Sequence, residues 1–415
     1  MILDKFSFGI GDRFARQGKA QLKAFQLAQK QGVNIAPVWN KSNREHSIIH
    51  TEPASVRTEA DAAVKATGYS GSYYVDADHI GLKNVDLFVD SSDFFTLDVA
   101  DAIGHKADEK DVAAFVKKHK KHAGSLAVAG IEKKLEISEK QIAAIAEKFL
   151  AAVKEAGKIY RHVKSVKGGE TFVTEVSMDE TDQPQTPIEM LFILAAIADE
   201  GIPASTVAPK FTGRFNKGVD YVGNTGQFAK EFEEDLAVIA YAVKTFGLPK
   251  ELKLSVHSGS DKFSIYRPIH AALKKFNAGV HIKTAGTTWL EEVTGLAMAG
   301  GEGLAIAKKV YANALGRFDE LCGPYATVIN IDRKGLPKVQ DVEKWSGEDF
   351  AAALRHEQSC RKYNPNFRQL LHVGYKVAAE LGSEYTNALK KNEKIIAENV
   401  TTNIYERHIK PIFAD

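Results

Sequence analysis

The sequence predicts an α/β fold in which parallel strands and the helices between them close into a (β/α)8, or TIM-type, barrel. Short apolar runs alternate with stretches of helical periodicity, and roughly seven to nine such runs can be counted. The runs are apolar on both faces, as buried parallel strands are. Most of them stop at a cluster of polar side chains, and in a barrel the carboxyl ends of all strands meet at one mouth.

The first part of the chain follows this alternation closely. Leu22, Phe25 and Ala28 recur at helical spacing, and Gly32 and Gly68 stand where two predicted helices end. We expect strands at residues 5–10, 33–39, 72–75 and 85–89, and helices at 18–31 and 52–67.

The alternation resumes after a lysine-rich and alanine-rich helical stretch. Pro187 suits the first turn of the helix that it opens. We expect strands at residues 171–176, 204–208, 252–256 and 280–282, and helices at 187–200, 226–246 and 266–276. A single catalytic domain would therefore span 1–415, with a possible helical insertion at 97–160 and a helical C-terminal extension at 300–415 packing on the barrel.

The composition is that of a globular enzyme rather than a binder of polyanions. The 415 residues carry a net charge of +2, which gives no reason to expect nucleic acid or a membrane surface as a partner. Cys322 and Cys360 show no disulfide or zinc-ligand spacing, which favours a reducing, cytoplasmic setting. The N-terminus has no apolar signal segment, and residues 190–198 fall far short of the ~20 residues of a spanning helix. The oligomeric state stays open.

Two strand ends carry histidines suited to a metal. Residues 75–79 read Val-Asp-Ala-Asp-His, where His79 suits a divalent cation and Asp78 suits proton transfer or support of the histidine. The alternative is a loop cap beside a surface histidine. His257 follows another strand, although it could be a core histidine bonded to the backbone. Two histidines at two strand ends favour a shared metal.

Carboxylates complete the expected site. The third metal ligand should be Asp220, with Glu180 or Asp261 in reserve. Glu175 lies within an apolar strand, where burial would favour its neutral form, so it suits a general acid. A buried salt bridge is the alternative for Glu175.

Cationic loop residues suggest contacts with a substrate. Lys210 could form a Schiff base, could hold a substrate carboxylate together with Arg214, or could be a plain loop charge. The segment 283–288 could wrap a phosphate or sugar hydroxyls, because Gly286 permits close backbone approach. There is no dinucleotide fingerprint, Walker sequence or GxSxG motif.

Several blocks together resemble the tagaturonate epimerase family, whose members interconvert D-tagaturonate and D-fructuronate. These blocks lie at residues 74–80, 208–215, 218–221, 256–262 and 403–408. The resemblance implies a small-molecule sugar acid as substrate and a divalent metal cation, with Zn, Mn, Ni, Co and Fe not distinguished. It also implies the following roles: Asp78 as base, Glu175 as acid, and His79, Asp220 and His257 as metal ligands. Apart from the resemblance, we expect Lys210, Arg214, Ser258 and Lys283 to contact the substrate, with Lys210 and Arg214 holding its carboxylate.

The implied reaction is inversion at C4 of a 2-keto hexuronate. The C4 hydrogen is not acidic and no nicotinamide motif is present, so retro-aldol opening and re-closure of the C3–C4 bond is the expected route. Two alternatives stay open. One is another barrel aldolase or isomerase, dependent on a metal or on a Lys210 Schiff base. The other is a non-catalytic sugar-acid binding protein.

Overall fold

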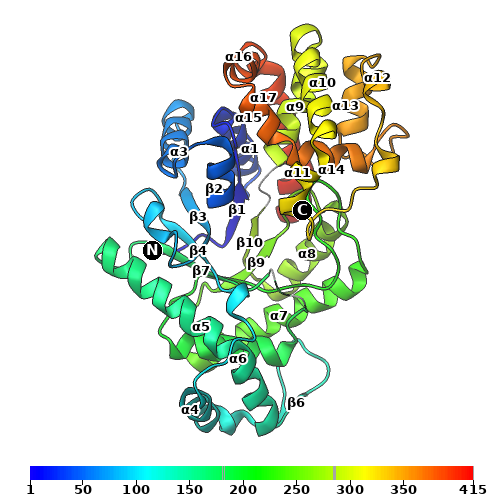
Figure 1. The fold of residues 1–415 in the computed structure, drawn as a ribbon. Coiled ribbons are helices and arrows are strands. Elements are labelled where there is room, and N and C mark those ends of the chain that lie inside the picture. Colours follow the sequence, from blue (N-terminus) through cyan, green and yellow to red (C-terminus); the bar gives the residue numbers. More distant parts are fainter. Residues whose placement is uncertain (180, 182, 284–286, 415) are drawn as a thin grey trace.

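The barrel is complete and closed. The computed structural model describes residues 1–179, 181, 183–283 and 287–414. Its strands follow one another around the barrel in the order β1-β10-β9-β8-β7-β4-β3-β2, and every neighbouring pair is parallel (Figure 1). The strands are β1 (Phe6–Ile10), β2 (Ala36–Ser42), β3 (Tyr74–Ile80), β4 (Phe94–Asp98), β7 (Val173–Ser177), β8 (Thr206–Ala208), β9 (Lys253–His257) and β10 (Val280–Lys283). The predicted TIM-type barrel is confirmed.

The fourth barrel strand does not lie where the sequence predicted it. Residues 85–89 begin with the 3-10 turn η1 (Val85–Leu87), and β4 follows instead, pairing Phe94 with Asp76 of β3. Val85 and Val89 are apolar because the turn buries them, not because they belong to the sheet. The third strand also runs past Val75 to Ile80, because its polar side chains face other polar groups inside the barrel.

Helices cover the outside of the barrel. Ser138 and Thr186 form capping boxes at the starts of α5 (Glu139–Lys167) and α6 (Pro187–Asp199). Pro187 stands in the first turn of α6, as predicted. The helices that follow strands are α1 (Gly18–Lys30), α2 (Asn43–Ile49), α3 (Ala54–Thr67), α5 (Glu139–Lys167), α6 (Pro187–Asp199), α7 (Thr225–Phe246), α8 (Phe263–Phe276) and α9 (Thr287–Ala299).

The segment between β4 and β7 forms one end of the molecule. It contains α4 (Glu109–His119) and an antiparallel hairpin of β5 (Gly124–Leu126) and β6 (Leu135–Ile137), drawn at the bottom of Figure 1. The expected insertion at 97–160 therefore begins inside β4, includes two short strands and ends inside α5. Short, partly exposed strands such as β5 carry little apolar signal, which is why the sequence suggested helix alone.

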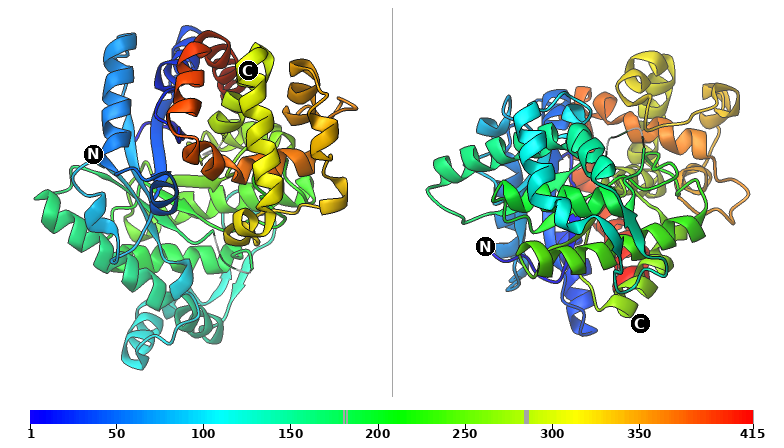
Figure 2. Two further views of the ribbon diagram at one scale, coloured as in Figure 1. Left: turned by 45° about the horizontal axis from the view of Figure 1, so that its top comes forward. Right: turned by 90° about the horizontal axis from the view of Figure 1, so that it is seen from below.

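The C-terminal third is helical and lies at the opposite end, as the views of Figures 1 and 2 agree. Here α17 (Glu393–Thr402) packs on α1 and α9, and α18 (Lys410–Phe413) packs on α8. The last helices therefore contact the helical layer of the barrel. Within the described chain, no helix is both long and apolar enough to cross a bilayer. These helices are α10 (Gly301–Gly316), α11 (Phe318–Cys322), α12 (Val339–Val342), α13 (Gly347–Leu354), α14 (Pro365–Val373), α15 (Tyr375–Glu380), α16 (Ser383–Lys391), α17 (Glu393–Thr402), the π-helix η6 (Asn403–Ile409) and α18 (Lys410–Phe413).

The barrel interior is divided into an apolar lower layer and a polar upper layer. The lower layer is a separate buried cluster of Leu3, Ala36, Val38, Tyr74, Phe94 and Val173. Above it, nearer the carboxyl ends of the strands, lie the buried side chains of Asp76, Thr96, Glu175 and Lys283. Because burying charge without partners is costly, this upper layer must satisfy itself internally, and that requirement shapes the site.

Candidate active site at the barrel mouth

The end of β3 is distorted in a way that directs two adjacent side chains to the same place. The pairing register between β3 and β4 shifts between Ala77 and Ile80, and His79 adopts a left-handed backbone conformation with φ of 54°. A regular strand would send Asp78 and His79 to opposite faces. Here both line one cavity, and such strained positions concentrate at functional sites.

This mouth cavity has a volume of about 520 Å³ and is strongly polar. Its lining comes from the ends of β3, β7, β8, β9 and β10, so residues far apart in the sequence meet there. The polar lining residues include Asp78, His79, Asp179, Lys210, Arg214, Lys217, His257 and Lys283.

Three of these residues form a group with the geometry of a metal site. His79, Asp179 and His257 each offer one ligand atom, and the three atoms lie within 4.8 Å of one another. Nδ1 of His257 is 3.1 Å from Asp179 Oδ2, yet the atom makes no hydrogen bond among the described residues. Burial alone would lower the pKa of His257, but Asp179 raises it to about 9. Two imidazoles and a carboxylate that converge in this way are a donor set suited to a divalent cation.

The remaining ring nitrogen of each histidine is held by a carboxylate. Nδ1 of His79 lies 2.8 Å from Asp78 Oδ1, and Nε2 of His257 lies 2.7 Å from Glu175 Oε1. Such partners fix the orientation and tautomer of a metal-binding imidazole, leaving the other nitrogen available. Each histidine therefore presents its second nitrogen toward Asp179.

Lys283 links the carboxylates beneath the cavity into what we call the Lys283 network. Its Nζ lies 2.8 Å from Asp76 Oδ2 and 2.7 Å from Asp78 Oδ1. It is also 2.6 Å from Thr96 Oγ1 and 3.4 Å from Glu175 Oε1. Burial alone would lower the pKa of Lys283, but the surrounding carboxylates raise it well above its usual value. One ammonium thus serves three acids, so the network carries excess negative charge.

The structure corrects the expected protonation of Glu175. Burial alone would raise its pKa, but Lys283 and His257 hold it well below its ordinary value. Its second oxygen accepts a hydrogen bond of 2.6 Å from Thr206, and the side chain is fully buried. Glu175 is also absent from the residues that line the mouth cavity. The arrangement matches the buried ion pair weighed for this residue, with an added function of orienting His257.

Asp220 lies outside the metal-ligand group. Its carboxylate accepts hydrogen bonds from the backbone and hydroxyl of Ser264 and from Gln358. It lines a different cavity, of about 380 Å³. The carboxylate that lies with His79 and His257 is that of Asp179, two positions beyond β7, and not the predicted Asp220.

The reserve ligands do not take that place either. Asp261 is fully buried and lies 2.8 Å from Arg368, 3.1 Å from His356 and 3.0 Å from His408; we call this the Asp261 network. It joins the loop after β9 to the C-terminal helices. Glu180 lies outside the described residues.

The expected substrate contacts divide into two groups. Lys210 and Arg214 line the mouth cavity, as does Lys283. Ser258 instead donates its hydroxyl to the main-chain oxygen of Lys283 at 2.5 Å, which ties β9 to β10 below the cavity. The predicted wrapping loop 283–288 falls partly on residues 284–286, which lie outside the described residues.

Sequence reasoning missed Asp179 and Asp76. Asp179 carried a usable signal, because it follows β7 at the same edge of the sheet as His79 and His257. Asp76 is fully buried beside Lys283, and burial raises its pKa to about 6. Its partner Lys283 comes from β10, the last barrel strand in the sequence, so no local pattern reveals it.

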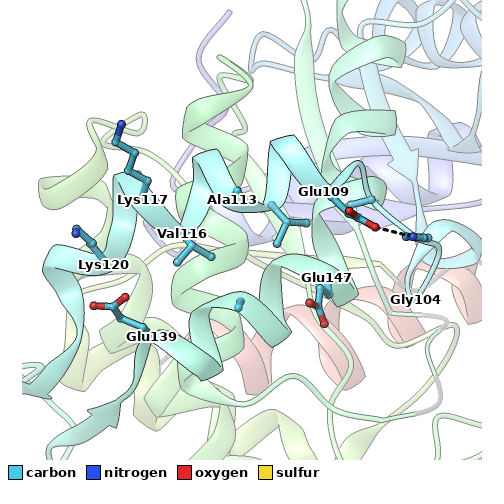
Figure 3. Close-up of a pocket in the computed structure, with 12 residues that line it drawn as sticks. Gly104, Glu109, Ala113, Val116, Lys117, Lys120, Glu139 and Glu147 are labelled. Carbon is cyan, nitrogen blue, oxygen red and sulfur yellow. Dashed lines mark hydrogen bonds and ion pairs between the residues drawn. The ribbon is translucent and has the colours of Figure 1, made fainter.

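A larger cavity, of about 870 Å³, lies between α4 and α5, far from the barrel strands (Figure 3). Its labelled charges, such as Lys117, Lys120 and Glu139, sit on the rim of an apolar floor formed by residues such as Ala113 and Val116. They do not converge on one point as the mouth residues do. The mouth cavity is therefore the better candidate for an active site than this one.

Comparisons with known proteins identify the family of this chain. Residues 1–412 match the model of the tagaturonate epimerase family. A tagaturonate/fructuronate epimerase of Thermotoga maritima is 29% identical over 425 residues, covering 97% of this chain and 80% of the relative.

Solved structures give the same fold. A glycerol-bound crystal structure of the fructuronate-tagaturonate epimerase of Cohnella laeviribosi is similar with a TM-score of 0.81 and 22% identity, covering 99% of this chain and 82% of that one. The native structure of the same protein gives a TM-score of 0.80 and 23% identity, with the same coverage. The chain belongs to the tagaturonate epimerase family and is thus a sugar-acid epimerase.

Proposed function

We propose that this protein interconverts D-tagaturonate and D-fructuronate by inversion at C4 and that it requires a divalent cation. Family membership and the name of the Thermotoga maritima relative support the substrate. The observation that carries the metal is the convergence of His79, Asp179 and His257, with the second nitrogen of each histidine held by a carboxylate.

The residues present fit a cation in both donor type and charge. Three carboxylates share the one ammonium of Lys283, and neutral imidazole nitrogens and the Asp179 carboxylate are donors that divalent cations accept. A bound divalent cation would polarise the C2 ketone of the substrate and so favour electron density at C3. Asp78 and Glu175 would hold the ligand histidines in place.

Asp78 is the residue best placed to move the proton. It lines the mouth cavity, and its Oδ1 is held by His79 and Lys283. The carboxylate takes the proton of the C4 hydroxyl as the C3–C4 bond opens, leaving an aldehyde at C4 and an enolate across C2 and C3. After the aldehyde turns, the bond re-forms on its other face and Asp78 returns the proton. Atoms and charge balance without an external oxidant.

The cavity walls keep the two fragments together while this happens. Lys210 and Arg214 line the side of the mouth that follows β8, where they can contact substrate oxygens. Holding both fragments in one cavity makes recombination effectively unimolecular. This requirement explains why a retro-aldol enzyme of this kind would release epimer rather than aldehyde.

One combined experiment tests the proposal. Purified protein would be analysed for bound metal and assayed with D-fructuronate before and after chelation, with metal restored afterwards. We expect stoichiometric metal, loss of epimerisation on chelation and recovery on addition of metal. Full activity in a metal-free preparation would contradict the metal requirement. Substrate-dependent attachment to Lys210 on borohydride reduction would favour the Schiff-base aldolase instead.

The route at C4 needs a separate measurement. Trapping of an aldehyde fragment during turnover, or exchange of that fragment with an added labelled aldehyde, is expected for bond cleavage. Detection of a C4 ketone with no trappable aldehyde would rule out the retro-aldol route while leaving the epimerase activity itself in place.

A further inference from the structure

A second cavity continues the mouth toward β1 and β2. It has a volume of about 300 Å³ and shares Asp78, His79 and Lys217 with the mouth cavity. Arg13, which follows β1, lines it together with Arg44 from α2. No sequence pattern singled out these two arginines, and the steps proposed above do not use them.

Arg13 is a buried cation that is only partly matched. Its side chain is 7% exposed, and Nη2 lies 3.0 Å from Glu45 Oε1. Nε and Nη1 are buried and have no hydrogen-bond partner within the described part of the chain. A guanidinium cannot lose its charge at ordinary pH, so unmatched buried donors are costly unless an anion binds them.

The surroundings hold Arg13 rigidly. Its guanidinium carbon lies 4.1 Å from the centre of the Tyr375 ring, and the Tyr375 hydroxyl is 2.7 Å from that of Tyr325. Glu45 cannot turn to satisfy the remaining donors, because its Oε2 accepts from the backbone and hydroxyl of Ser42 in a capping box. The guanidinium is therefore fixed at the wall of this cavity, with two nitrogens that no described group satisfies and that are closed to solvent in this conformation.

We propose that Arg13 binds the carboxylate of the sugar acid and is the residue that selects a hexuronate over the neutral ketose. The proposal rests on the proposed function, since it names the subsite for one end of that substrate. Lys217 and Arg44 line the same cavity as Arg13, and so do the carboxylates of Glu45, Asp78 and Asp98. The carboxylate would lie on the side of β1 and β2, leaving Lys210 and Arg214 beyond β8 to contact hydroxyl groups.

The chemistry of the cavity supports placing the substrate carboxylate beside Arg13. A carboxylate accepts charge-assisted hydrogen bonds from arginine that are stronger than those of neutral groups. The shared residues Asp78 and His79 place the reacting carbons at the junction of the two cavities. An acid group a few carbons away then enters the Arg13 side. A neutral hydroxymethyl group at that position would leave the guanidinium unmatched, which is a strong basis for discrimination.

The test compares binding of D-fructuronate with that of neutral D-fructose by calorimetry, using wild type, Arg13→Gln, Arg13→Lys and Arg214→Gln. We expect Arg13→Gln to weaken D-fructuronate binding about 10- to 100-fold, as loss of a charged hydrogen bond does, and to leave D-fructose binding unchanged. Arg13→Lys should recover part of the lost affinity. The matched control is Arg161→Gln, which removes an exposed arginine of α5 that pairs with Glu200. This variant should bind both ligands as wild type does.

The outcomes separate the two proposals. Equal D-fructuronate affinity in wild type and Arg13→Gln, or equal weakening of both ligands, would overturn the carboxylate assignment. A larger acid-specific loss in Arg214→Gln than in Arg13→Gln would move the subsite to the β8 side. Binding does not require turnover, so the assignment is measured even if wild type fails to epimerise D-fructuronate, a result that would refute only the proposed function. Far-ultraviolet circular dichroism of both Arg13 variants shows whether each is folded, and Arg13→Lys keeps the charge if Arg13→Gln is not.

Discussion

The molecule contains two buried charge networks in which the signs of the charges are reversed. In the Lys283 network one cation faces three carboxylates, whereas in the Asp261 network one carboxylate faces an arginine and two histidines. The first opens on the mouth cavity through Asp78 and Lys283. In the second, Asp261 and Arg368 are fully buried, and His356 lines the cavity of about 380 Å³ that Asp220 also lines, away from the mouth.

The difference suggests how to distinguish residues that act at the mouth cavity from residues that stabilise the fold. Excess negative charge beside a cavity leaves room for a cation and for proton transfer. The Asp261 network faces protein on every side that its contacts describe, joining the loop after β9 to α14 and η6. Substitutions should therefore affect turnover in the first network and stability in the second.

The largest effect is expected from Asp78→Asn. Loss of the proposed base should lower kcat for D-fructuronate epimerisation about 10²- to 10⁴-fold, because general-base contributions are of that size. The measurement is steady-state kinetics on metal-loaded protein. Asp86→Asn removes a carboxylate that is 71% exposed and should leave kcat unchanged. Near-normal turnover in Asp78→Asn would assign the proton to another group.

Arg368→Met tests the Asp261 network. Removing one partner leaves Asp261 as a poorly matched buried charge, so the free energy of unfolding should fall by about 3–5 kcal/mol. Denaturant titration measures it, and metal content of the folded protein should be retained. Arg317→Met, which breaks a surface contact with Glu320 and Glu380, should cost about 1 kcal/mol or less. Similar losses in the two variants would mean that Arg368 is not a structural anchor.

Glu175→Gln sharpens the boundary between the networks, because Glu175 is buried yet belongs to the site. It should weaken metal binding about 10- to 100-fold through the orientation of His257, with the fold intact. Competition with a metal indicator measures the affinity. Glu170→Gln, an exchange at a carboxylate that is 53% exposed, serves as control. If both variants bind metal equally well, Glu175 does not orient the ligand.

The smallest effect concerns pH. Burial alone would raise the pKa of Asp261, but Arg368 and the neighbouring histidines hold it well below the usual value. A lowered pKa in the folded state stabilises the protein above the unfolded value of about 3.9 and ceases to do so as the pH falls through the folded value. The stability difference between wild type and Asp261→Asn should thus be constant above about pH 5 and shrink by up to about 1.4 kcal/mol per pH unit below it. Urea titrations from neutral to acid pH measure this difference. A stability difference that becomes larger as the pH falls would contradict the lowered pKa of Asp261.

The sequence predicted those parts of the site that depend on strand ends alone. His79 and His257 terminate or nearly terminate β3 and β9, so parallel strands bring them together whatever the loops do. Asp220 failed because it lies in a long loop after β8, and that loop folds back until its carboxylate meets Gln358, 138 positions away. Loop paths depend on distant partners that no local pattern contains.

Glu175 shows a second limit. Its burial was readable from the apolar residues around it, but the sign of its pKa shift depends on Lys283 and His257, which come from other strands. Burial and counter-charge act in opposite directions, and sequence displays only the first. The fold class was easier to predict, because alternation of strands and helices is repeated many times along the chain, so errors such as the misplaced fourth strand do not change it.

The Asp261 network also has a consequence for biosynthesis. Asp261 leaves the ribosome before its partner Arg368, which is 107 residues further along, and His408 emerges later still. Until translation has passed these positions, Asp261 lacks the arginine and the two histidines that surround it in the folded protein. All barrel strands are therefore synthesised before the residues that pair with Asp261, and the loop after β9 reaches its final packing only once the C-terminal helices are present.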